Sequence, residues 1–500
     1  MRGVLALDQG GHASRACIVD EHGDIVAEQQ VAIATTHGSD GEVEHNADEI
    51  ASSLRAAAVS VLRGAGELVI DAAGLATQRS TIVCFEPRSG SALSPAISWQ
   101  DRRNAAWLQS FAAYTARIGA LTGLPLSPHY GVGKMRWCLD HLPAVQRARE
   151  RADLAIGPLA AYLMMRLTGG AALADPANAS RTLLWDSGER DWSAELLQLF
   201  GIERAWLPLC TPTRTSYGHL QLDDGAAGVT GAARPIALRA VTGDQSAIPF
   251  AFGTPDSTCV YINLGTGAFI QRPLAVRPVD AAPLLASVLL ADRDGALYSL
   301  EGTVNGAGAA ISRFVAEAGV PEALLWRQLE TLVPALVLPL YINGIGGLGS
   351  PYWRSQQASY FVDDDDGEGE GEGEGDRDGE NLRRFAAVLE SIVFLIAINF
   401  DLMRARGGAL TRVIVSGGLS RSDWLCRRLA AVLGVPVLRG AQEATVLGVA
   451  ALAAPELLAH IGHRRSQASA QPRFDPDLLP PWERAALMAR RARFEDALRP

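Results

Sequence analysis

Lysine is almost missing from this chain of 500 residues: Lys134 is the single lysine, and every other member of the 45 basic side chains is arginine. An ammonium group is a compact point charge, whereas a guanidinium is a planar fork. The retained lysine therefore points either to a task that arginine does not perform or to a surface residue left by chance. Composition alone leaves both interpretations open.

Cysteine is also scarce, with 6 residues spread far apart, so their spacing indicates neither a zinc site nor a disulfide framework. We expect small buried thiols in a reducing compartment. The apolar run before Asp8 is too short for the core of a signal peptide. We also expect that no segment approaches the length and apolar character of a membrane-spanning helix. These absences predict a cytoplasmic protein without a membrane partner.

Excess charge of one sign is confined to one segment. The net charge is −10, and the segment from Asp363 to Glu380 carries −10 by itself, leaving 44 basic and 44 acidic residues elsewhere. Binding of nucleic acid by a broad basic surface is therefore disfavoured. The segment reads DDDDGEGEGEGEGDRDGE, and its repetition and self-repulsion predict a disordered loop.

Apolar material is abundant, since 48% of the residues are hydrophobic, enough for two cores. We predict two α/β domains, residues 1–245 and 246–500. In the first half, periodicity predicts strands and a helix over residues 4–20, 25–33, 48–62 (with Asn46 or Asp48 as N-cap) and 68–70. The second half repeats this order over residues 259–262, 268–271, 297–300, 308–318, 413–415 and 422–433. The repetition indicates duplication, and a helix is expected near the C-terminus.

One short pattern occurs in both halves. Asp8-Gln9-Gly10 closes the apolar run 4–7, Asn263-Leu264-Gly265 closes the apolar run 259–262, and each pattern is followed by a second apolar run. A strand, a Gly turn and a returning strand form a hairpin whose backbone N–H groups can face phosphates. Two such hairpins predict a phosphate held between two related domains.

Further glycine patterns were weighed for phosphate binding. Ser416-Gly417-Gly418 joins a strand to a helix, an arrangement that receives phosphate or adenosine, and residues 74–79 are its expected counterpart in the first half. Residues 344–349 fit G-x-G-x-x-G, but Pro351 follows at once, so no helix is expected there to face a pyrophosphate. Gly133-Lys134 lacks the remaining elements of a Walker A loop.

The carboxylates of Asp8 and Asp244 each stand where an apolar run meets a glycine turn. Transfer of a phosphoryl group to a hydroxyl needs Mg²⁺, donors around the phosphates and a base near the acceptor oxygen. Asp8 is a candidate for the metal and Asp244 for the base. The alternative, that both carboxylates only stabilise turns, is left open by their spacing.

Segments along nearly the whole chain resemble, in order, the FGGY carbohydrate kinases, and most of all their glycerol kinase members. These segments are LALDQGGHASRACIVDEHG, GLATQRSTIVCFE, AISWQDRR, ADPANASRTLLWD, TGDQSAIPFAFG, INLGTGAFI, EGTVNGAGAAI, VIVSGGLSRSDWLCRRLAAVLGVPV and EATVLGVAALAA. The resemblance implies a two-domain, actin-like (ribonuclease H-like) α/β fold with duplicated mixed sheets flanked by helices. It also implies ATP and Mg²⁺ in an interdomain cleft that closes about a hinge.

The resemblance also implies roles for individual residues. Asp244 corresponds to the catalytic base and Asp8 to the acidic residue near Mg²⁺. The substrate-binding positions are Arg79, Ser80, Trp99, His129, Asp244 and Gln245. The nucleotide-binding positions are Gly10, Gly11, His12, Arg15, Gly265, Thr266, Gly308, Gly417 and Gly418. Lys134 falls where the family has a Gly-Thr-Lys stretch, which favours a task for it over chance.

Several positions depart from glycerol kinase. Ser80 stands where that enzyme has a glutamate, which removes a strong hydrogen-bond acceptor. His129 replaces a tyrosine, although Tyr130 is adjacent and can take its place. Gly11 and His12 replace hydroxyl residues of the first hairpin. These changes enlarge and neutralise the pocket, as a different polyol or a sugar requires, and leave glycerol in doubt.

We predict an enzyme that uses ATP to phosphorylate a hydroxyl of a small polyol or sugar, and we expect a homodimer. Glycerol or a close triol is one acceptor class, and a longer sugar, sugar acid or polyol is the other. The alternative function is a catalytically impaired nucleotide-binding homologue with a regulatory role. Gly11 and His12 motivate that alternative, whereas the presence of Asp8 and Asp244 argues against it.

Overall fold

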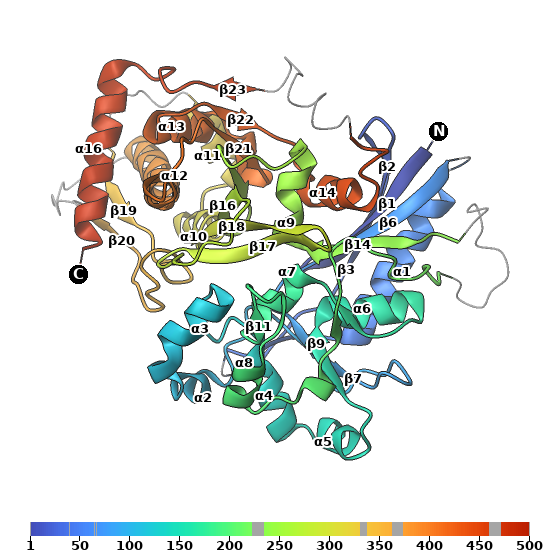
Figure 1. Cartoon of the computed structure of the whole chain (residues 1–500). Coiled ribbons are helices and arrows are strands. Elements are labelled where there is room, and N and C mark those ends of the chain that lie inside the picture. Colours follow the sequence, from blue (N-terminus) through green and yellow to red (C-terminus); the bar gives the residue numbers. More distant parts are fainter. Residues whose placement is uncertain are drawn as a thin grey trace.

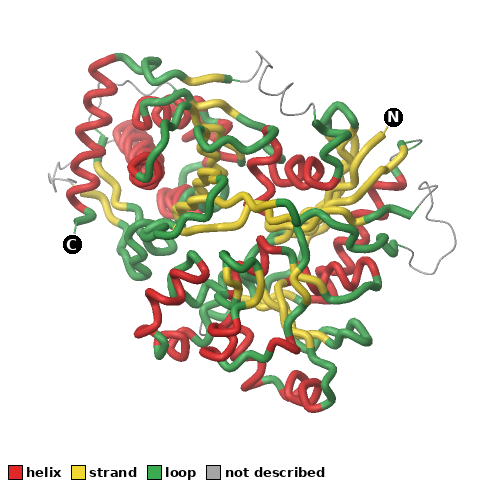
Figure 2. Tube along the Cα trace, viewed as in Figure 1, coloured by secondary structure: helices red, strands yellow, loops and turns green. Residues whose placement is uncertain are grey.

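Two large mixed sheets, one from each half of the chain, form the framework of the protein (Figures 1 and 2). The computed structural model describes residues 2–39, 41–64, 66, 68–222, 235–330, 338–362, 374–459 and 472–499. In Figure 1 the first sheet lies on the side of the N-terminus, and the second lies among the helices near the C-terminus. A group of helices with smaller sheets lies below both.

The first sheet has the strand order β14-β6-β1-β2-β3. Its strands are β1 (Arg2–Gln9), β2 (Ala13–Asp20), β3 (Ile25–Ala32), β6 (Val69–Thr77) and β14 (Leu238–Gly243). Strands β1, β6 and β14 are parallel, whereas β2 is antiparallel to both β1 and β3. The predicted meander over residues 4–33 is confirmed. The parallel members place three carboxyl ends at one edge of the sheet.

Helix α1 (Ala47–Arg63) packs on this sheet, mainly against β2 and β3. The side-chain oxygen of Asn46 accepts hydrogen bonds from the backbone N–H groups of Asp48 and Glu49, at 3.0 and 3.1 Å. This cap and the two acidic residues in the first turn favour a helix start at this point. The predicted helix over residues 48–62 is confirmed, with Asn46 as its cap.

The second sheet repeats the pairing pattern of the first. Its order is β17-β18-β16-β15-β21-β22-β23. The strands are β15 (Cys259–Leu264), β16 (Ala268–Leu274), β17 (Leu285–Asp292), β18 (Gly295–Val304), β21 (Arg412–Ser416), β22 (Val437–Arg439) and β23 (Arg473–Phe474). From β18 to β22 the pairings run antiparallel, antiparallel, parallel, parallel, as they do from β3 to β14. The predicted duplication is confirmed, although β17 was not predicted.

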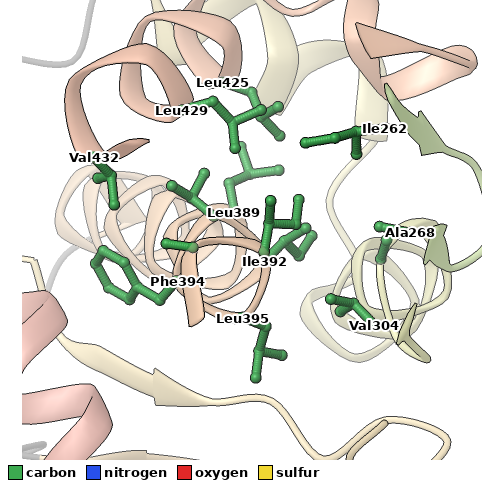
Figure 3. Close-up of a cluster of buried hydrophobic side chains, with 14 of the residues drawn as sticks. Ile262, Ala268, Val304, Leu389, Ile392, Phe394, Leu395, Leu425, Leu429 and Val432 are labelled. Atoms are coloured by element: carbon green, nitrogen blue, oxygen red, sulfur yellow. The ribbon is translucent and has the colours of Figure 1, made fainter. Parts of the chain in front are cut away.

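Helix α12 (Glu374–Ala405) is the central helix of the second half (Figure 3). Its residues Leu389, Ile392 and Phe394 lie in one cluster with residues of α13 (Asp423–Leu433) and of the second sheet. The part Gly379–Ala405 is long and apolar enough to cross a membrane, and 83% of its most apolar window is buried in the protein. The expectation that no segment approaches a membrane span is therefore wrong. A helix enclosed on all sides is apolar all round, as a spanning helix is.

The acidic segment was predicted as a loop over residues 363–380. Residues 363–373 lie outside the described residues, but residues 374–380 form the first turns of α12, so the prediction is wrong there. Extending an existing helix adds one hydrogen bond for each residue fixed. An ion pair of 2.9 Å between Arg384 and Glu380, one turn apart, adds to this.

Helix α14 (Ala444–Ala453) belongs to the second half of the sequence but packs on the first sheet, against β1, β6 and β14. The contact is close: a Cβ added to Gly74 on β6 would lie 2.7 Å from the carbonyl oxygen of Val449. The prediction that residues 74–79 form a strand-to-helix turn is therefore wrong. Gly74 lies within β6, and the chain continues through a turn into another strand.

A third sheet and several helices form the remainder of the first half. The sheet has the order β4-β5-β8-β7-β9, with strands β4 (Thr36–His37), β5 (Val43–His45), β7 (Ile82–Phe85), β8 (Ala96–Ile97) and β9 (Ala155–Pro158). The helices are α2 (Ala105–Gln109), α3 (Thr115–Thr122), α4 (Gly131–His141), α5 (Pro143–Glu150), α6 (Leu159–Thr168), α7 (Pro176–Ala179) and α8 (Ala194–Phe200). Short 3₁₀ segments are η1 (Ala112–Tyr114), η2 (Ser180–Thr182) and η3 (Arg204–Trp206). Two-stranded pairs join β10 (Leu173–Ala174) to β13 (Leu209–Cys210) and β11 (Trp185–Asp186) to β12 (Asp191–Trp192).

The other elements of the second half are α9 (Asp244–Ala247), η4 (Ile248–Phe252), α10 (Gly308–Ala318), α11 (Glu322–Leu329), β19 (Leu340–Ile342), β20 (Tyr360–Val362), η5 (Gly418–Arg421) and α16 (Pro481–Ala497). The predicted helices over 308–318 and near the C-terminus are confirmed. The six cysteines are free thiols, five of them buried.

The glycines of residues 344–349 serve protein packing. A Cβ at Gly344 would lie 2.2 Å from the carbonyl oxygen of Gln357, and a Cβ at Gly349 would lie 2.3 Å from that of Thr303. The segment continues in turns rather than in a helix. The prediction that no helix follows this motif is therefore confirmed.

Candidate active site

The residues predicted to form the reacting centre lie at the carboxyl ends of β1, β6 and β14. Asp8 near the end of β1 is in register with Ala76 of β6, and Thr242 of β14 is in register with the same residue. Gly243 ends β14, and Asp244 begins α9. This edge is where ligands bind in open sheets with parallel strands. Strand β14 followed by α9 is thus the strand-to-helix turn of the first half.

Asp244 lies close enough to Asp8 to influence the ionisation of Asp8. Burial and, second to it, the charge of Asp244 raise the pKa of Asp8 to about 7, although the charge of Arg15 opposes them. Burial also raises the pKa of Asp244, while Arg79 opposes that shift. The Oδ1 atom of Asp8 is buried and receives no hydrogen bond from the described residues. Two carboxylates with raised pKa values at a sheet edge are typical of a functional site.

Arg79 lies in the turn after β6, directly over the start of α9. A Cβ at Gly243 would lie 2.5 Å from both Cγ and Cδ of Arg79, so the residue before Asp244 must be glycine to admit this side chain. The Nε of Arg79 is 3.8 Å from Oδ1 of Asp244. Its two terminal nitrogens donate to Glu301 of β18, at 3.0 and 2.5 Å. Arg79 therefore lies between the base candidate and the second sheet.

The single lysine is buried beneath the acceptor side of the site. Lys134 on α4 has no exposed surface, and its ammonium donates to the backbone carbonyl oxygens of Ser80 at 3.0 Å and His129 at 2.7 Å. Burial lowers the pKa of Lys134 to about 7. A compact ammonium joins two segments that the resemblance assigned to the substrate, so its retention has a structural reason.

The side chains of these segments form an aromatic and neutral polar wall. The ring of Trp99 lies 5.7 Å from that of His129, which lies 5.1 Å from that of Tyr130. Burial, and then the charges of Lys134 and two arginines, lower the pKa of His129 well below its ordinary value, so the imidazole is neutral near pH 7. Ser80 has a φ of +66°, and its buried Oγ has no partner among the described residues.

The turn between β15 and β16 is joined to helix α10 by backbone hydrogen bonds. The N–H groups of Ala307 and Ala309 donate to the carbonyl of Thr266, each at 3.0 Å, and the N–H of Gly308 donates to that of Gly265 at 2.9 Å. A Cβ at Gly308 would lie 2.8 Å from the Gly265 oxygen. The turn and the start of α10 are therefore one unit that depends on glycine.

The glycine turn after β21 lies beside the β15–β16 turn, because Asn263 and Ser416 are in register on these parallel strands. Gly417 has a φ of +82°, and a Cβ there would lie 2.6 Å from the Leu264 carbonyl oxygen. A Cβ at Gly418 would meet nothing within 4 Å. The structure thus brings Gly265, Thr266, Gly308, Gly417 and Gly418 together at one edge of the second sheet.

The two edges are linked through Gln245. Its backbone N–H donates to Oδ1 of Asp244 at 2.7 Å, and its side-chain oxygen accepts from the amide of Asn263 at 3.2 Å. Asn263 lies near the end of β15, two residues before Gly265 of the second glycine turn. The side chain of Gln245 therefore connects the candidate base, Asp244, to the predicted nucleotide-binding side.

The first glycine turn, residues 10–12, is less enclosed. The N–H of Gly10 donates to the carbonyl of Ala13 at 3.0 Å, and a Cβ at Gly11 would meet only Nε1 of Trp99, at 3.9 Å. The His12 side chain is exposed. Arg15 lies across from Asp8 on β2 and forms ion pairs with Glu443 and Glu28. The predicted turn is present, but the side chain of His12 is exposed to solvent and that of Arg15 pairs with acidic residues.

Three residues of the site were not singled out from the sequence: Glu301, Arg181 and Ser287. They form a buried group with Arg79, in which Arg181 and Ser287 each contact Oε2 of Glu301. The two arginines lower the pKa of Glu301 although burial opposes them. A signal did exist, since Glu301 is an acid within the apolar strand SLEGTV. A buried charge in such a strand requires partners.

A divalent cation fits the first edge. Within the part of the chain that the structure describes, no group of three His, Cys, Asp or Glu residues could hold a metal ion. Mg²⁺ is usually bound by one or two carboxylates together with phosphates and water. The buried, unpaired Oδ1 of Asp8 beside a second carboxylate meets that requirement.

Comparison with known proteins gives a consistent result. Residues 3–251 match the N-terminal domain of the FGGY family of carbohydrate kinases, and residues 260–456 match its C-terminal domain. A glycerol kinase of Thermus brockianus is 35% identical over 466 residues, which cover 90% of this chain and 89% of that protein. One of Trichlorobacter lovleyi is 36% identical over 461 residues with the same coverage.

Solved structures share the fold. A Plasmodium falciparum glycerol kinase with ADP superposes with a TM-score of 0.85 at 20% identity, covering 100% of this chain and 99% of the other. A ligand-bound xylulose kinase of Lactobacillus acidophilus has a TM-score of 0.82 at 19% identity, covering 99% and 98%. A gluconate kinase of the same organism has a TM-score of 0.80 at 19% identity, covering 99% and 97%. The predicted two-domain kinase fold is confirmed.

Proposed function

Because this chain belongs to the FGGY family of carbohydrate kinases, and is therefore an ATP-dependent kinase of a polyol or sugar hydroxyl, we propose that Asp244 is the base of the transfer. One observation carries the proposal. Asp244 begins α9 at the carboxyl edge of the first sheet, with its side chain 26% exposed and Arg79 3.8 Å away. A half-buried carboxylate that is open on one side can reach a hydroxyl.

The position of Asp244 suits proton transfer. Burial raises its pKa, which makes the carboxylate a stronger base, while the charge of Arg79 opposes that shift. The hydrogen bond from the Gln245 N–H holds one carboxylate oxygen, Oδ1. Oδ2, which accepts only a long hydrogen bond of 3.4 Å from Nε2 of Gln245, then accepts the proton of the acceptor hydroxyl. The hydroxyl oxygen bonds to the terminal phosphorus of ATP as the bond from that phosphorus to the bridging oxygen breaks and ADP leaves.

The nucleotide side uses backbone groups. Phosphoryl transfer depends mainly on positioning and on neutralising charge around the phosphates. The β15–β16 turn offers N–H groups and the Thr266 hydroxyl, and the open space beside Gly418 suits the adenosine part. The first turn, with Gly10 and Gly11, offers N–H groups from the opposite sheet.

Asp8 is the residue that we propose for Mg²⁺, with Asp244 beside it. The ion supplies positive charge that offsets the charge of the transferred phosphoryl group. The residues of this chain provide the unpaired Oδ1 of Asp8 and hold it at the strand end next to the first turn. Arg15, in register with Asp8, lowers its pKa and so favours the ionised form.

We propose a polyol longer than glycerol, or a sugar, as the acceptor. The unpartnered Oγ of Ser80 and the neutral imidazole of His129 offer weak, uncharged hydrogen bonds beside the face of Trp99. Both terminal nitrogens of Arg79 are already bound by Glu301. Uncharged hydroxyl groups on a carbon chain suit such a wall.

A panel of acceptors in a coupled assay of ADP formation tests this function. The panel holds glycerol, the acceptor named by the relatives in sequence, together with tetritols, pentitols, xylulose and gluconate. We expect a longer polyol or a sugar to give the highest kcat/KM. If glycerol does, the inference from Ser80 and His129 is wrong. If no acceptor yields ADP while ATP still binds, the kinase function itself is refuted.

Gly11 and His12 motivate the regulatory alternative, but Asp8 and Asp244 occupy one edge as a kinase requires, which argues against it. We further propose a soluble cytoplasmic enzyme that forms a homodimer and binds neither nucleic acid nor membrane. The domain division at residues 245 and 246 also remains a proposal. Sedimentation of the purified chain tests the dimer.

A further inference from the structure

A buried carboxylate of the second half holds the arginine that lies beside Asp244. Glu301 on β18 is 1% exposed and accepts hydrogen bonds from Nη1 of Arg79 at 3.0 Å and from Nη2 at 2.5 Å. Arg181 of η2 and Ser287 of β17 also donate to Oε2 of Glu301. One acid thus receives two guanidinium groups and a hydroxyl.

These contacts join the two halves of the chain next to the reacting centre. Arg79 and Arg181 come from the first half, whereas Glu301 and Ser287 lie on neighbouring strands of the second sheet. Arg181 also donates to the Ser287 hydroxyl at 2.6 Å. Glu301 is therefore one point at which the second sheet contacts the predicted acceptor side of the first half.

The contacts of Arg79 fix the direction in which its side chain points. Its stem crosses Gly243, and its two terminal nitrogens are bound side by side to one carboxylate, a pairing that fixes the guanidinium plane. The remaining nitrogen, Nε, then faces Oδ1 of Asp244 at 3.8 Å. Without the acid, two buried arginines would lie close together with like charge, and they would separate.

We propose that Glu301 is a positioning residue that aims Arg79 at Asp244 and so sets the geometry of the acceptor side. Among the described residues, no hydrogen bond joins Glu301 to Asp244 or to the predicted nucleotide turns, so its geometric effect passes through Arg79. The charge of Glu301 also acts directly on Asp244, whose pKa it raises. The inference rests on the proposed role of Asp244 as base.

The chain contains a matched control. Glu390 of α12 is also 1% exposed and also receives two arginines: Arg490 at 2.7 Å through two nitrogens, and Arg428 at 3.3 Å. Its partners lie on α13 and α16, within the second half. Glu390→Gln makes the same chemical change as Glu301→Gln, with the same loss of a buried ion pair, but does not touch Arg79.

Kinetics on the full-length enzyme give the first readout. We expect both variants to lower Tm, but only Glu301→Gln to lower kcat/KM for the acceptor, by about tenfold or more, with the KM for ATP changed by less than about threefold. Ser287→Ala removes one hydroxyl and keeps both arginines, so its effect on kcat/KM should stay below about threefold. Equal kinetics for Glu301→Gln and Glu390→Gln would overturn the proposal.

Crystal structures of the wild type and Glu301→Gln give a readout that needs no turnover. We expect Arg79 to leave Asp244 in the variant. If Arg79 keeps its place, the positioning role is overturned whatever the rates are. An inactive wild type would refute the proposed function of Asp244 instead, and the position of Arg79 in the two structures would still decide what Glu301 does.

Discussion

The two glycine turns that oppose each other in this protein are built in different ways. The turn after β15 is held by backbone hydrogen bonds to α10, and glycine at position 308 permits that contact. At the edge of the first sheet, the important groups are side chains: Asp8, Asp244, Arg79 and, beneath them, Lys134. The same strand pattern thus carries a predicted site of backbone groups on one sheet and a predicted site of side chains on the other.

The difference follows from what each side would bind. A triphosphate offers the same oxygens in every reaction, so fixed N–H groups can serve it. Acceptors differ in length and in the pattern of their hydroxyl groups, and a catalytic base needs a shifted pKa. Both requirements are met by side chains, which can differ from one enzyme to another, at the edge of the first sheet. Substitutions of Asp244, Arg79 or Lys134 at the first edge should therefore act on the chemistry and the acceptor, and substitutions at the second edge should act on ATP.

The largest effect should come from Asp244→Asn. Asparagine keeps the size of the side chain but does not accept the proton, so kcat should fall by about 10³-fold. Coupled ADP formation measures the rate, and circular dichroism with Tm shows whether the fold is kept. A residual rate within about tenfold of the wild type would contradict the role of base.

Lys134→Met tests whether the acceptor side depends on one buried ammonium. The carbonyl oxygens of Ser80 and His129 would each lose a donor, at a cost of about 1–3 kcal/mol for each buried group. We expect a lower Tm and a KM for the acceptor raised by about tenfold, with the KM for ATP little changed. Lys134→Arg is the control: a larger guanidinium at a site with no exposed surface should not restore function. Wild-type kinetics in that variant would disprove the compact-charge interpretation.

A matched pair of alanine variants compares the turns directly. In Gly308→Ala the new Cβ would lie 2.8 Å from the Gly265 oxygen, so α10 must move away and the KM for ATP should rise by about fivefold to tenfold. In Gly11→Ala the nearest atom is 3.9 Å away, so Tm should change by less than about 2 °C. Nucleotide titration and thermal unfolding measure both. A reversed order of effects on Tm would show that the second turn is not the tighter one.

The smallest effect concerns stability and pH. Asp8 has a pKa of about 7 in the folded protein against 3.8 for an unperturbed group, so the folded state retains a proton that the unfolded state loses between these values. Its contribution to stability is therefore lost as pH rises from about 4 to 7. Asp8→Asn removes this dependence. In metal-free, nucleotide-free buffer, its Tm should exceed that of the wild type by a few degrees at pH 8 and match it at pH 4.

Thermal unfolding at several pH values checks the Asp8 prediction, and addition of Mg²⁺ with ADP sharpens it. The ligands should stabilise the wild type more than Asp8→Asn, because the variant lacks the carboxylate proposed for the ion. A difference in Tm that stays constant from pH 4 to pH 8 would contradict the raised pKa.

Local sequence patterns predicted a helix correctly where the spacing of apolar residues and an N-cap residue indicated the same helix. The helix over residues 48–62 has an apolar stripe and the cap at Asn46, and both appear in the structure. Residues 74–79 were misinterpreted because glycine serves turns and close packing alike, and only the position of α14 distinguishes the two. The helix at residues 374–380 was missed because its support comes from the rest of α12.

The sequence by itself determined the duplicated order of strands, the two glycine turns, the family and the positions of Asp8 and Asp244, because these depend on residues close together in the chain or on motifs in a fixed order. Only the tertiary structure decided that Arg79 is bound by Glu301, that Lys134 holds the backbone of Ser80 and His129, and that α14 lies on the first sheet. Those contacts join segments that are distant in sequence. Their partners are chosen by strand order and by the need to pair buried charge, and neither can be read from any single segment.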